Sequence, residues 1–136
     1  MALPLQSART ITKLPTQDLE RARRWYRDVL GLEAAEERDG GLRYECAGTE
    51  FHLFASAGAA SGESTQMAFE VEDLGAAVAG LRALGLELEV FDMPGFEVED
   101  GVITVPDNYP SKGSGEVGAF FRDSEGNLLA LGQPTR

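Results

Sequence analysis

The chain has 136 residues, 43% of them apolar, which is typical of one compact domain with its own hydrophobic core. Its 23 acidic and 12 basic residues give a formal net charge of −11, which disfavours binding to nucleic acid or to anionic membranes. Cys46 is the only cysteine, so no disulfide can form within the chain. With no recognisable signal peptide and no apolar run of membrane-spanning length, we expect a globular cytoplasmic protein.

In chain order, the first half predicts a strand, a helix and three further strands. Residues 8–15 form a short extended stretch, and the segment from Thr16 onward places apolar residues at helical spacing. Asp18 is positioned to cap this helix, and Gly31 to end it in the left-handed conformation. The following strands are predicted over residues 32–39, 42–47 and 50–56, with tight turns at the glycines between them.

The second half repeats this order. Residues 66–72 predict a strand, and the next segment predicts a helix that Asp73 caps and Gly85 ends, as Asp18 and Gly31 do in the first half. Further strands are predicted over residues 86–92, 97–105, 116–123 and 128–133. The repeat predicts an α+β fold of two tandem βαβββ modules within a single domain, 1–136. Module one covers about 8–56, a flexible linker 57–64, and module two about 65–133, with a second flexible segment at 104–115.

Three segments carry a resemblance to a known family. In order, DLERARRWYRDVLGL, EVEDLGAAVAGLRALGLE and FFRDSEGNLLAL resemble the vicinal oxygen chelate superfamily, which includes glyoxalase I, extradiol dioxygenases, fosfomycin-modifying enzymes and bleomycin-resistance proteins. The resemblance covers nearly the whole chain. It implies a cup-shaped, curved mixed sheet with helices on its outer face and a pocket inside the cup. Because members share this scaffold and differ in chemistry, function depends on the residues that line the cup.

The metal-binding members that the chain resembles carry metal ligands at four positions of the cup. The matching positions in this sequence are Ile11, His52, Gln66 and Ala130. A catalytic divalent ion generally needs three protein ligands and an open position, and the side chains of Ile11 and Ala130 have no donor atom. We therefore expect no metal cofactor of the family type, while an atypical divalent metal site stays open as an alternative.

His52, the only histidine, is the candidate catalytic or ligand-orienting residue. Strand alternation places it on the face of Glu50 and Phe54, opposite Phe51 and Leu53. The repeat predicts that His52 and Gln66 face one cavity, where an imidazole and an amide can hydrogen-bond the polar group of a ligand. The other expected lining residues are Ile11, Ala130, Tyr44, Phe54, Phe96 and Phe121, the last chosen from the pair Phe120 and Phe121, of which only one can face inward.

Three functions are compatible with these residues. The first is a metal-free protein that binds an aromatic or cationic small molecule in the cup, as the resemblance to bleomycin-resistance proteins implies and as the aromatic set and acidic charge favour. The second is a lyase or isomerase-type enzyme acting through His52, with either an atypical metal or none. The third is a subunit without a site, since members commonly form homodimers. We favour the first, and expect a homodimer from the resemblance alone.

Overall fold

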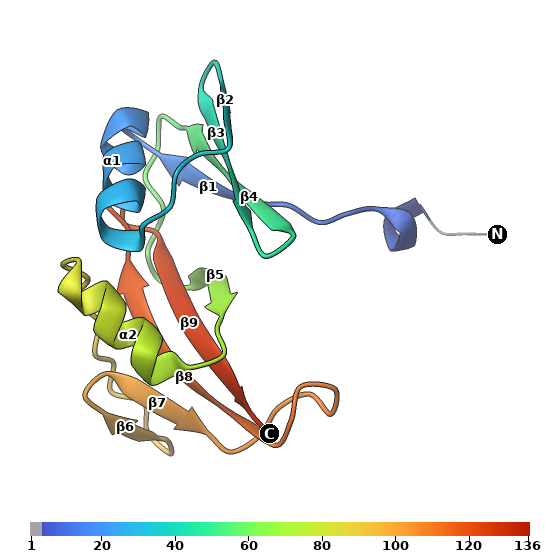
Figure 1. The fold of residues 1–136 in the computed structure, drawn as a ribbon, viewed down its shortest axis with the longest axis vertical. Helices are drawn as coiled ribbons and strands as arrows, with labels where there is room; N and C mark the ends of the chain where they lie inside the picture. Colours follow the sequence, from blue (N-terminus) through green and yellow to red (C-terminus); the bar gives the residue numbers. More distant parts are fainter. Residues whose placement is uncertain (1–3) are drawn as a thin grey trace.

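In the computed structural model, which describes residues 4–136, the chain forms two mixed β-sheets placed one after the other along the long axis (Figure 1). After a short 3-10 helix η1 (Pro4–Ser7), module one contains β1 (Thr12–Thr16), α1 (Leu19–Leu30), β2 (Glu36–Arg38), β3 (Gly41–Cys46) and β4 (Thr49–Ala55). Module two contains β5 (Thr65–Glu70), α2 (Leu74–Ala83), β6 (Glu97–Glu99), β7 (Val102–Val105), β8 (Gly115–Arg122) and β9 (Leu128–Thr135).

The two sheets repeat one topology. Their strand orders are β1-β4-β3-β2 and β5-β9-β8-β7-β6, and in each sheet the first strand lies parallel to the last one while the remaining pairs are antiparallel. The predicted α+β fold of two repeated modules is confirmed. Module two carries one strand more than module one, because β6 extends the edge of its sheet. Neither α-helix within residues 4–136 has the length and apolar character that crossing a membrane requires.

Two strand predictions in module two were wrong. Residues 86–92 form no strand and contribute only an isolated bridge between Glu89 and Phe120. Residues 97–105 form the hairpin of β6 and β7 instead of one strand. The turn lies at Asp100 and Gly101, whose φ values are 52° and 81°. Two successive residues with positive φ are what a tight hairpin turn of this hand requires, and Asp-Gly is a favoured pair for it.

Both predicted helix caps are confirmed. The Asp18 carboxylate accepts a hydrogen bond from the Arg21 backbone N–H at 3.0 Å, and the Asp73 carboxylate accepts one from the Ala76 N–H at the same distance. Gly31 caps the end of α1 with φ 69°, in the left-handed region that glycine adopts without strain. The repeat in the sequence therefore reflects two helices that begin in the same way.

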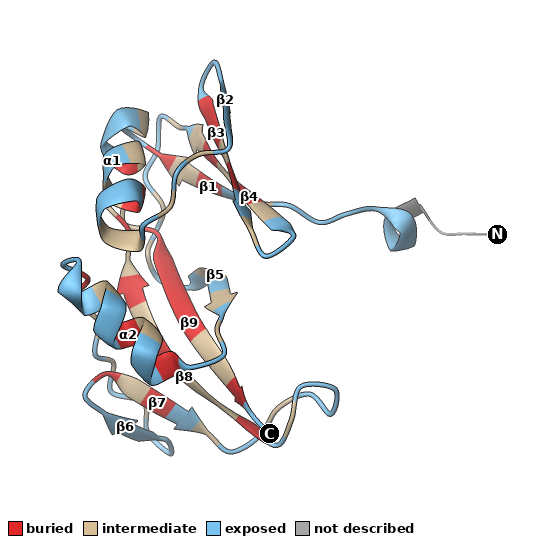
Figure 2. Cartoon of the chain, viewed as in Figure 1, coloured by how far each residue is buried: buried red, intermediate tan, exposed pale blue. Residues whose placement is uncertain are grey.

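The core lies between α1 and the sheet of module one, and continues to β8 and β9 (Figure 2). Ala22 and Tyr26 on α1 are fully buried, and the Tyr26 ring packs 5.5 Å from the Tyr44 ring, centroid to centroid. Tyr44 stacks in turn on Phe51 of the neighbouring strand at 5.0 Å. Because side chains alternate along a strand, the intervening residues of β3 and β4 point to the other face of this sheet.

Glu125, in the turn between β8 and β9, fastens module two to the start of α1. Its side chain is only 1% exposed. The carboxylate accepts hydrogen bonds from the backbone N–H groups of Gln17 at 2.9 Å and Asp18 at 3.0 Å. It also accepts two from the Arg21 guanidinium, from Nε at 2.8 Å and Nη2 at 2.9 Å. The Arg21 hydrogen bonds in particular lower the pKa of Glu125 to about 2.

A second buried carboxylate in the same turn completes this connection. The Tyr26 hydroxyl donates to Asp123 Oδ2 at 2.7 Å, and Asn127 Nδ2 donates to the same oxygen at 2.8 Å. The other Asp123 oxygen accepts from the backbone N–H groups of Glu125 and Asn127. Asn127 Nδ2 also donates to the Pro15 carbonyl at 3.0 Å. The sequence predicted only a turn here, and in the structure this turn is one of the places where the modules meet.

Candidate functional site

A row of polar side chains crosses the face of the first sheet that is opposite α1. The strand register places Lys13 of β1 beside His52 of β4, and His52 beside Arg43 of β3. Arg43 is in turn paired with Glu36 of β2. These four positions share one face because directly paired residues project to the same side of a sheet. The predicted orientation of His52, with Glu50 and Phe54 and opposite the buried Phe51 and Leu53, is confirmed.

The next row of the same face contains Phe54, Gly41 and Arg38. Phe54 is paired with Gly41, and Gly41 with Arg38. The Arg38 side chain lies over Gly41, since a Cβ atom at that glycine would come within 3.2 Å of Arg38 Nε and 3.3 Å of Arg38 Cγ. Gly41 does not adopt a positive φ, so its backbone conformation does not require a glycine. Its missing side chain instead makes room for the Arg38 guanidinium against the sheet.

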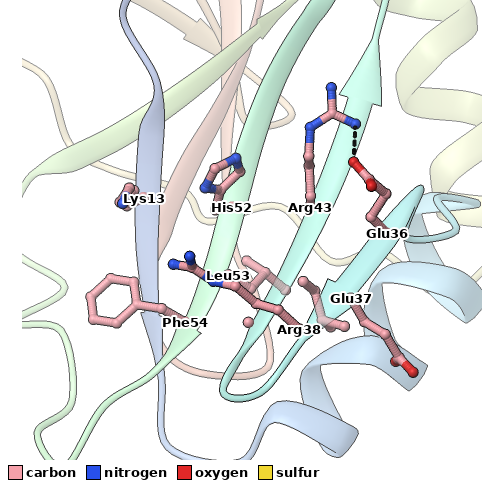
Figure 3. A pocket seen from close by; sticks show the side chains of 10 residues that line it. Lys13, Glu36, Glu37, Arg38, Arg43, His52, Leu53 and Phe54 are labelled. Carbon is pink, nitrogen blue, oxygen red and sulfur yellow. Dashed lines mark hydrogen bonds and ion pairs between the residues drawn. The ribbon is translucent and has the colours of Figure 1, made fainter.

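These two rows line a pocket of about 500 Å³ (Figure 3). Phe54, His52 and the Arg38 guanidinium surround one space in this view, with Lys13 beside it on β1. The pocket is lined by Lys13, Glu36, Glu37, Arg38, Gly41, Leu42, Arg43, His52, Leu53 and Phe54, all of module one. A volume of this size is within the usual range for small-molecule sites.

Glu50 holds the histidine. Its Oε2 atom lies 2.8 Å from His52 Nε2 and accepts a hydrogen bond from Arg43 Nε, also at 2.8 Å. The other oxygen lies 3.7 Å from the Arg9 guanidinium. Hydrogen bonds from His52 and Arg43 lower the pKa of Glu50. The carboxylate therefore fixes one ring nitrogen of His52, so that the imidazole has a defined orientation in the pocket wall.

The side chains around His52 do not fit a catalytic metal ion. Glu50 is the nearest carboxylate, but the oxygen that faces His52 also accepts a hydrogen bond from the Arg43 guanidinium, whose positive charge would repel a cation. Within residues 4–136 there is no group of three or more His, Cys, Asp or Glu side chains that could hold a metal ion.

The pocket contains only two of the side chains that the sequence predicted for it, His52 and Phe54. Gln66 does not share the pocket with His52; it lies on β5 at an irregularity in the pairing with β9, and its Oε1 atom is buried without a partner among the described residues. Ala130 is buried on β9, paired with Ala68 and Phe120. The prediction that His52 and Gln66 face one cavity is therefore not met within this chain.

The remaining four predicted lining residues also lie elsewhere. Tyr44 is 1% exposed and packs against α1, where burial raises its pKa to about 12. Phe121 is fully buried, with its ring stacked near Trp25, so the member of the pair on the opposite face is Phe120. Phe96 precedes β6 in module two and is 42% exposed. Ile11 precedes β1 and is 41% exposed, outside the pocket lining.

Sequence reasoning missed the basic residues Lys13, Arg38 and Arg43. Arg43 was accessible in principle, because a two-residue turn at Ala47 and Gly48 places it opposite His52 in a hairpin. To predict that Lys13 lines the pocket, the parallel register between β1 and β4 must be known, and no local pattern encodes that register. The role of Arg38 could not be predicted without the structure, because it depends on its side chain crossing Gly41 on the neighbouring strand.

A second cavity, of about 310 Å³, lies where the two modules meet. It is apolar and is lined by Leu30, Leu32, Cys46, Phe69, Val71, Ala76, Ala77, Gly80, Leu81 and Leu131. Burial raises the pKa of Cys46, which favours the neutral thiol. The cavity therefore offers apolar contacts and no charged side chain, in contrast to the pocket around His52.

Comparison with protein families identifies the architecture. Residues 9–131 match the family model described as the glyoxalase/bleomycin resistance protein/dioxygenase superfamily. The chain belongs to this superfamily. The predicted family relationship is thereby confirmed over most of the sequence. None of the curated proteins compared with the chain matches it.

Solved structures of superfamily members have the same fold. A glyoxalase/bleomycin resistance protein/dioxygenase from Nocardioides is 21% identical, with a TM-score of 0.65 over 100% of this chain and 87% of its own. Lactoylglutathione lyase from Agrobacterium tumefaciens is 22% identical, with a TM-score of 0.60 over 93% of each chain. A bleomycin-binding protein in complex with bleomycin is 18% identical, with a TM-score of 0.65 over 95% of this chain and 100% of its own. At these identities the likeness concerns the fold alone.

Proposed function

We propose that the protein reversibly binds a small aromatic molecule in the pocket around His52, without a metal ion. The observation that carries this proposal is the arrangement of the pocket wall. Phe54 offers a ring face and Arg38 an alkyl chain for apolar contact, while His52, held by Glu50 at 2.8 Å, offers an oriented polar group. The bleomycin-binding relative, solved with its ligand, is a precedent for small-molecule binding on this fold.

The charges that line the pocket do not favour the cationic ligand that we expected from the sequence. We expected an aromatic or cationic ligand from the resemblance to bleomycin-resistance proteins, the aromatic residues and the net charge of −11. The basic side chains Lys13, Arg38, Arg43 and His52 line the pocket, against only two carboxylates, Glu36 and Glu37. Local charge matters more than net charge for a ligand in contact with the wall. We therefore retain the aromatic ligand and set the cationic one aside.

Phe54→Ala is expected to weaken aromatic binding by about tenfold, since it removes the ring that an aromatic ligand would contact. Phe96→Ala is the matched control, because Phe96 is a half-exposed aromatic residue outside the pocket. Affinities for benzyl alcohol, benzoate and benzylamine are measured by calorimetry on protein treated with a chelator and on untreated protein. We expect at least one compound to bind both samples equally. Equal loss of affinity in the two variants, or binding only without chelator, would count against the proposal.

A second function, acid/base catalysis by His52, is favoured by one specific observation. The contact between Glu50 and His52 orients an imidazole in a ligand-sized pocket, as general acid/base chemistry needs. Such an enzyme would be of the lyase or isomerase type. Recovery of a chemically altered ligand after incubation, with the conversion lost in His52→Gln and binding retained, would establish this alternative over reversible binding.

We also propose a homodimer that works in the cytoplasm. The supporting features of the chain are two exposed apolar side chains near its start, Leu5 at 85% and Ile11 at 41%, and a free cysteine compatible with a reducing compartment. The segment that contains Leu5 projects away from the body of the molecule (Figure 1). Light scattering coupled to gel filtration measures the mass directly, and a mass of one chain would contradict the dimer.

A further inference from the structure

We infer that the ligand of this pocket is an aromatic carboxylate whose anionic group is held by Lys13 and Arg38. This inference rests on the proposed function and specifies the ligand class that the same site takes. The basis of the inference is that some charges of the pocket wall are neutralised by neighbouring side chains, while others are not.

Each of the two carboxylates that line the pocket forms an ion pair with an arginine. Glu36 accepts a hydrogen bond from Arg43 Nη1 at 3.3 Å, and Glu37 is bound by the guanidinium of Arg23 on α1. Arg43 is itself saturated, because it also contacts Glu45 at 2.7 Å and Glu50 at 2.8 Å. The paired groups of the wall thus contribute little net charge toward a ligand.

Lys13 and Arg38 differ from most basic residues of this chain. The basic side chains that form ion pairs are Arg9, Arg21, Arg23, Arg27, Arg43, Arg82, Lys112 and Arg122. In the described part of the chain, neither Lys13 nor Arg38 has a carboxylate within ion-pair distance or a side-chain hydrogen bond. Two unneutralised cations in one pocket, in a chain rich in carboxylates, leave a positive site that a ligand anion can occupy.

The position of Arg38 favours a carboxylate. The side chain lies flat over Gly41, and Figure 3 shows its guanidinium directed toward the space between Phe54 and His52. A planar guanidinium donates two parallel hydrogen bonds to a carboxylate, whereas the Lys13 ammonium acts as a compact point charge beside it. The Phe54 ring then lies on the side where an aromatic group attached to the carboxylate would extend. The three side chains together match an aromatic acid.

The experiment compares three probes, benzoate, phenyl phosphate and benzylamine, by calorimetry at low ionic strength. We expect benzoate to bind at least about tenfold more tightly than benzylamine, because of the two only benzoate can accept hydrogen bonds from the charged groups of Arg38 and Lys13. Benzoate affinity is expected to fall as salt is added, since exposed charges are screened. Tighter binding of phenyl phosphate than of benzoate would overturn the assignment of a carboxylate.

Four variants test the two cations. Arg38→Ala and Lys13→Ala are each expected to weaken benzoate by about tenfold. Gly41→Ala keeps every charge but places a methyl group in contact with the Arg38 side chain, so it should weaken benzoate as well. Arg24→Ala removes one exposed positive charge of α1 outside the pocket, and should change the affinity less than about twofold. Arg38→Lys replaces Gly41→Ala if the latter fails to fold, since it keeps the charge and loses the planar fork.

The outcomes separate the inference from the function on which it rests. If benzylamine binds as tightly as benzoate, or if Arg38→Ala behaves like Arg24→Ala, the anion site is wrong while aromatic binding at Phe54 stands. If none of the probes nor benzyl alcohol binds the folded protein, the proposed function itself fails. Benzoate binding that depends on Arg38, Lys13 and Gly41 but not on Arg24 would support the site as described.

Discussion

Glu125→Ala is expected to lower the free energy of unfolding by about 3 kcal/mol, because it removes four hydrogen bonds of a buried carboxylate, two of them from a charged guanidinium. The substitution removes the acceptor for the backbone N–H groups of Gln17 and Asp18 and for two guanidinium hydrogen bonds of Arg21. Urea denaturation measures the change. Glu97→Ala, at an exposed position of β6, is the control and should cost less than about 0.5 kcal/mol.

The same carboxylate should make stability depend on acid. Its pKa is about 2 in the folded protein, below the value of 4.5 for an ordinary glutamate. Because the folded state binds the proton less tightly, the stabilisation is complete above pH 4.5 and is lost as the pH falls toward 2. Glu125→Gln cannot ionise and should show a smaller loss of stability over this interval than the unmodified chain. If the free energy of unfolding fell equally with pH in the two proteins, this role of Glu125 would be contradicted.

Asp123→Ala is expected to destabilise the protein by about 3 to 4 kcal/mol, comparable to Glu125→Ala. Asp123 is 6% exposed and accepts four hydrogen bonds, two of them from side chains. Tyr26→Phe removes only one of the four donors and should cost about 1 to 2 kcal/mol. Burial of the Tyr26 hydroxyl is the main cause that raises the pKa of Tyr26 well above 10, and the contact with Asp123 is the next largest. The hydroxyl therefore stays a donor at neutral pH.

A double-mutant cycle isolates the hydrogen bond between Tyr26 of module one and Asp123 of module two. The effects of Asp123→Ala and Tyr26→Phe should not add, because both remove the same 2.7 Å hydrogen bond. We expect a coupling free energy of at least about 1 kcal/mol from denaturation of the two single variants and the double variant. Full additivity would mean that the hydrogen bond does not contribute to holding the turn of module two against α1.

The fold was predictable from the sequence because its signals are local. Asp18 and Asp73 are helix caps, and each acts on a backbone amide only three residues away. Together with Gly31, they revealed the repeat that defines the two modules. The failures in module two also have local causes: Asp100 adopts a positive φ that splits one predicted strand, and the segment around Glu89 contributes a single bridge without continuing as a strand.

The candidate site was less predictable because it depends on contacts between distant segments. Strand alternation limited the choice to Phe120 or Phe121, but only the packing of α1 decides which of them is buried. Outside the site, the role of Glu125 was equally hard to predict, because its partner Arg21 lies more than 100 positions away and the sequence showed only a turn. The orientation of Arg38 follows from the absence of a side chain at Gly41 on the neighbouring strand.

The central claim is that a ligand binds in the pocket around His52, and the only histidine of the chain tests it most directly. In an untagged protein, the imidazole Cε1–H resonance of His52 is the single signal of its kind in a proton NMR spectrum. During a titration of chelator-treated protein with benzoate, we expect this resonance to shift along a saturable curve with the Kd that calorimetry gives. A resonance that does not move while benzoate binds with that Kd would contradict the account, because the ligand would then occupy another part of the molecule.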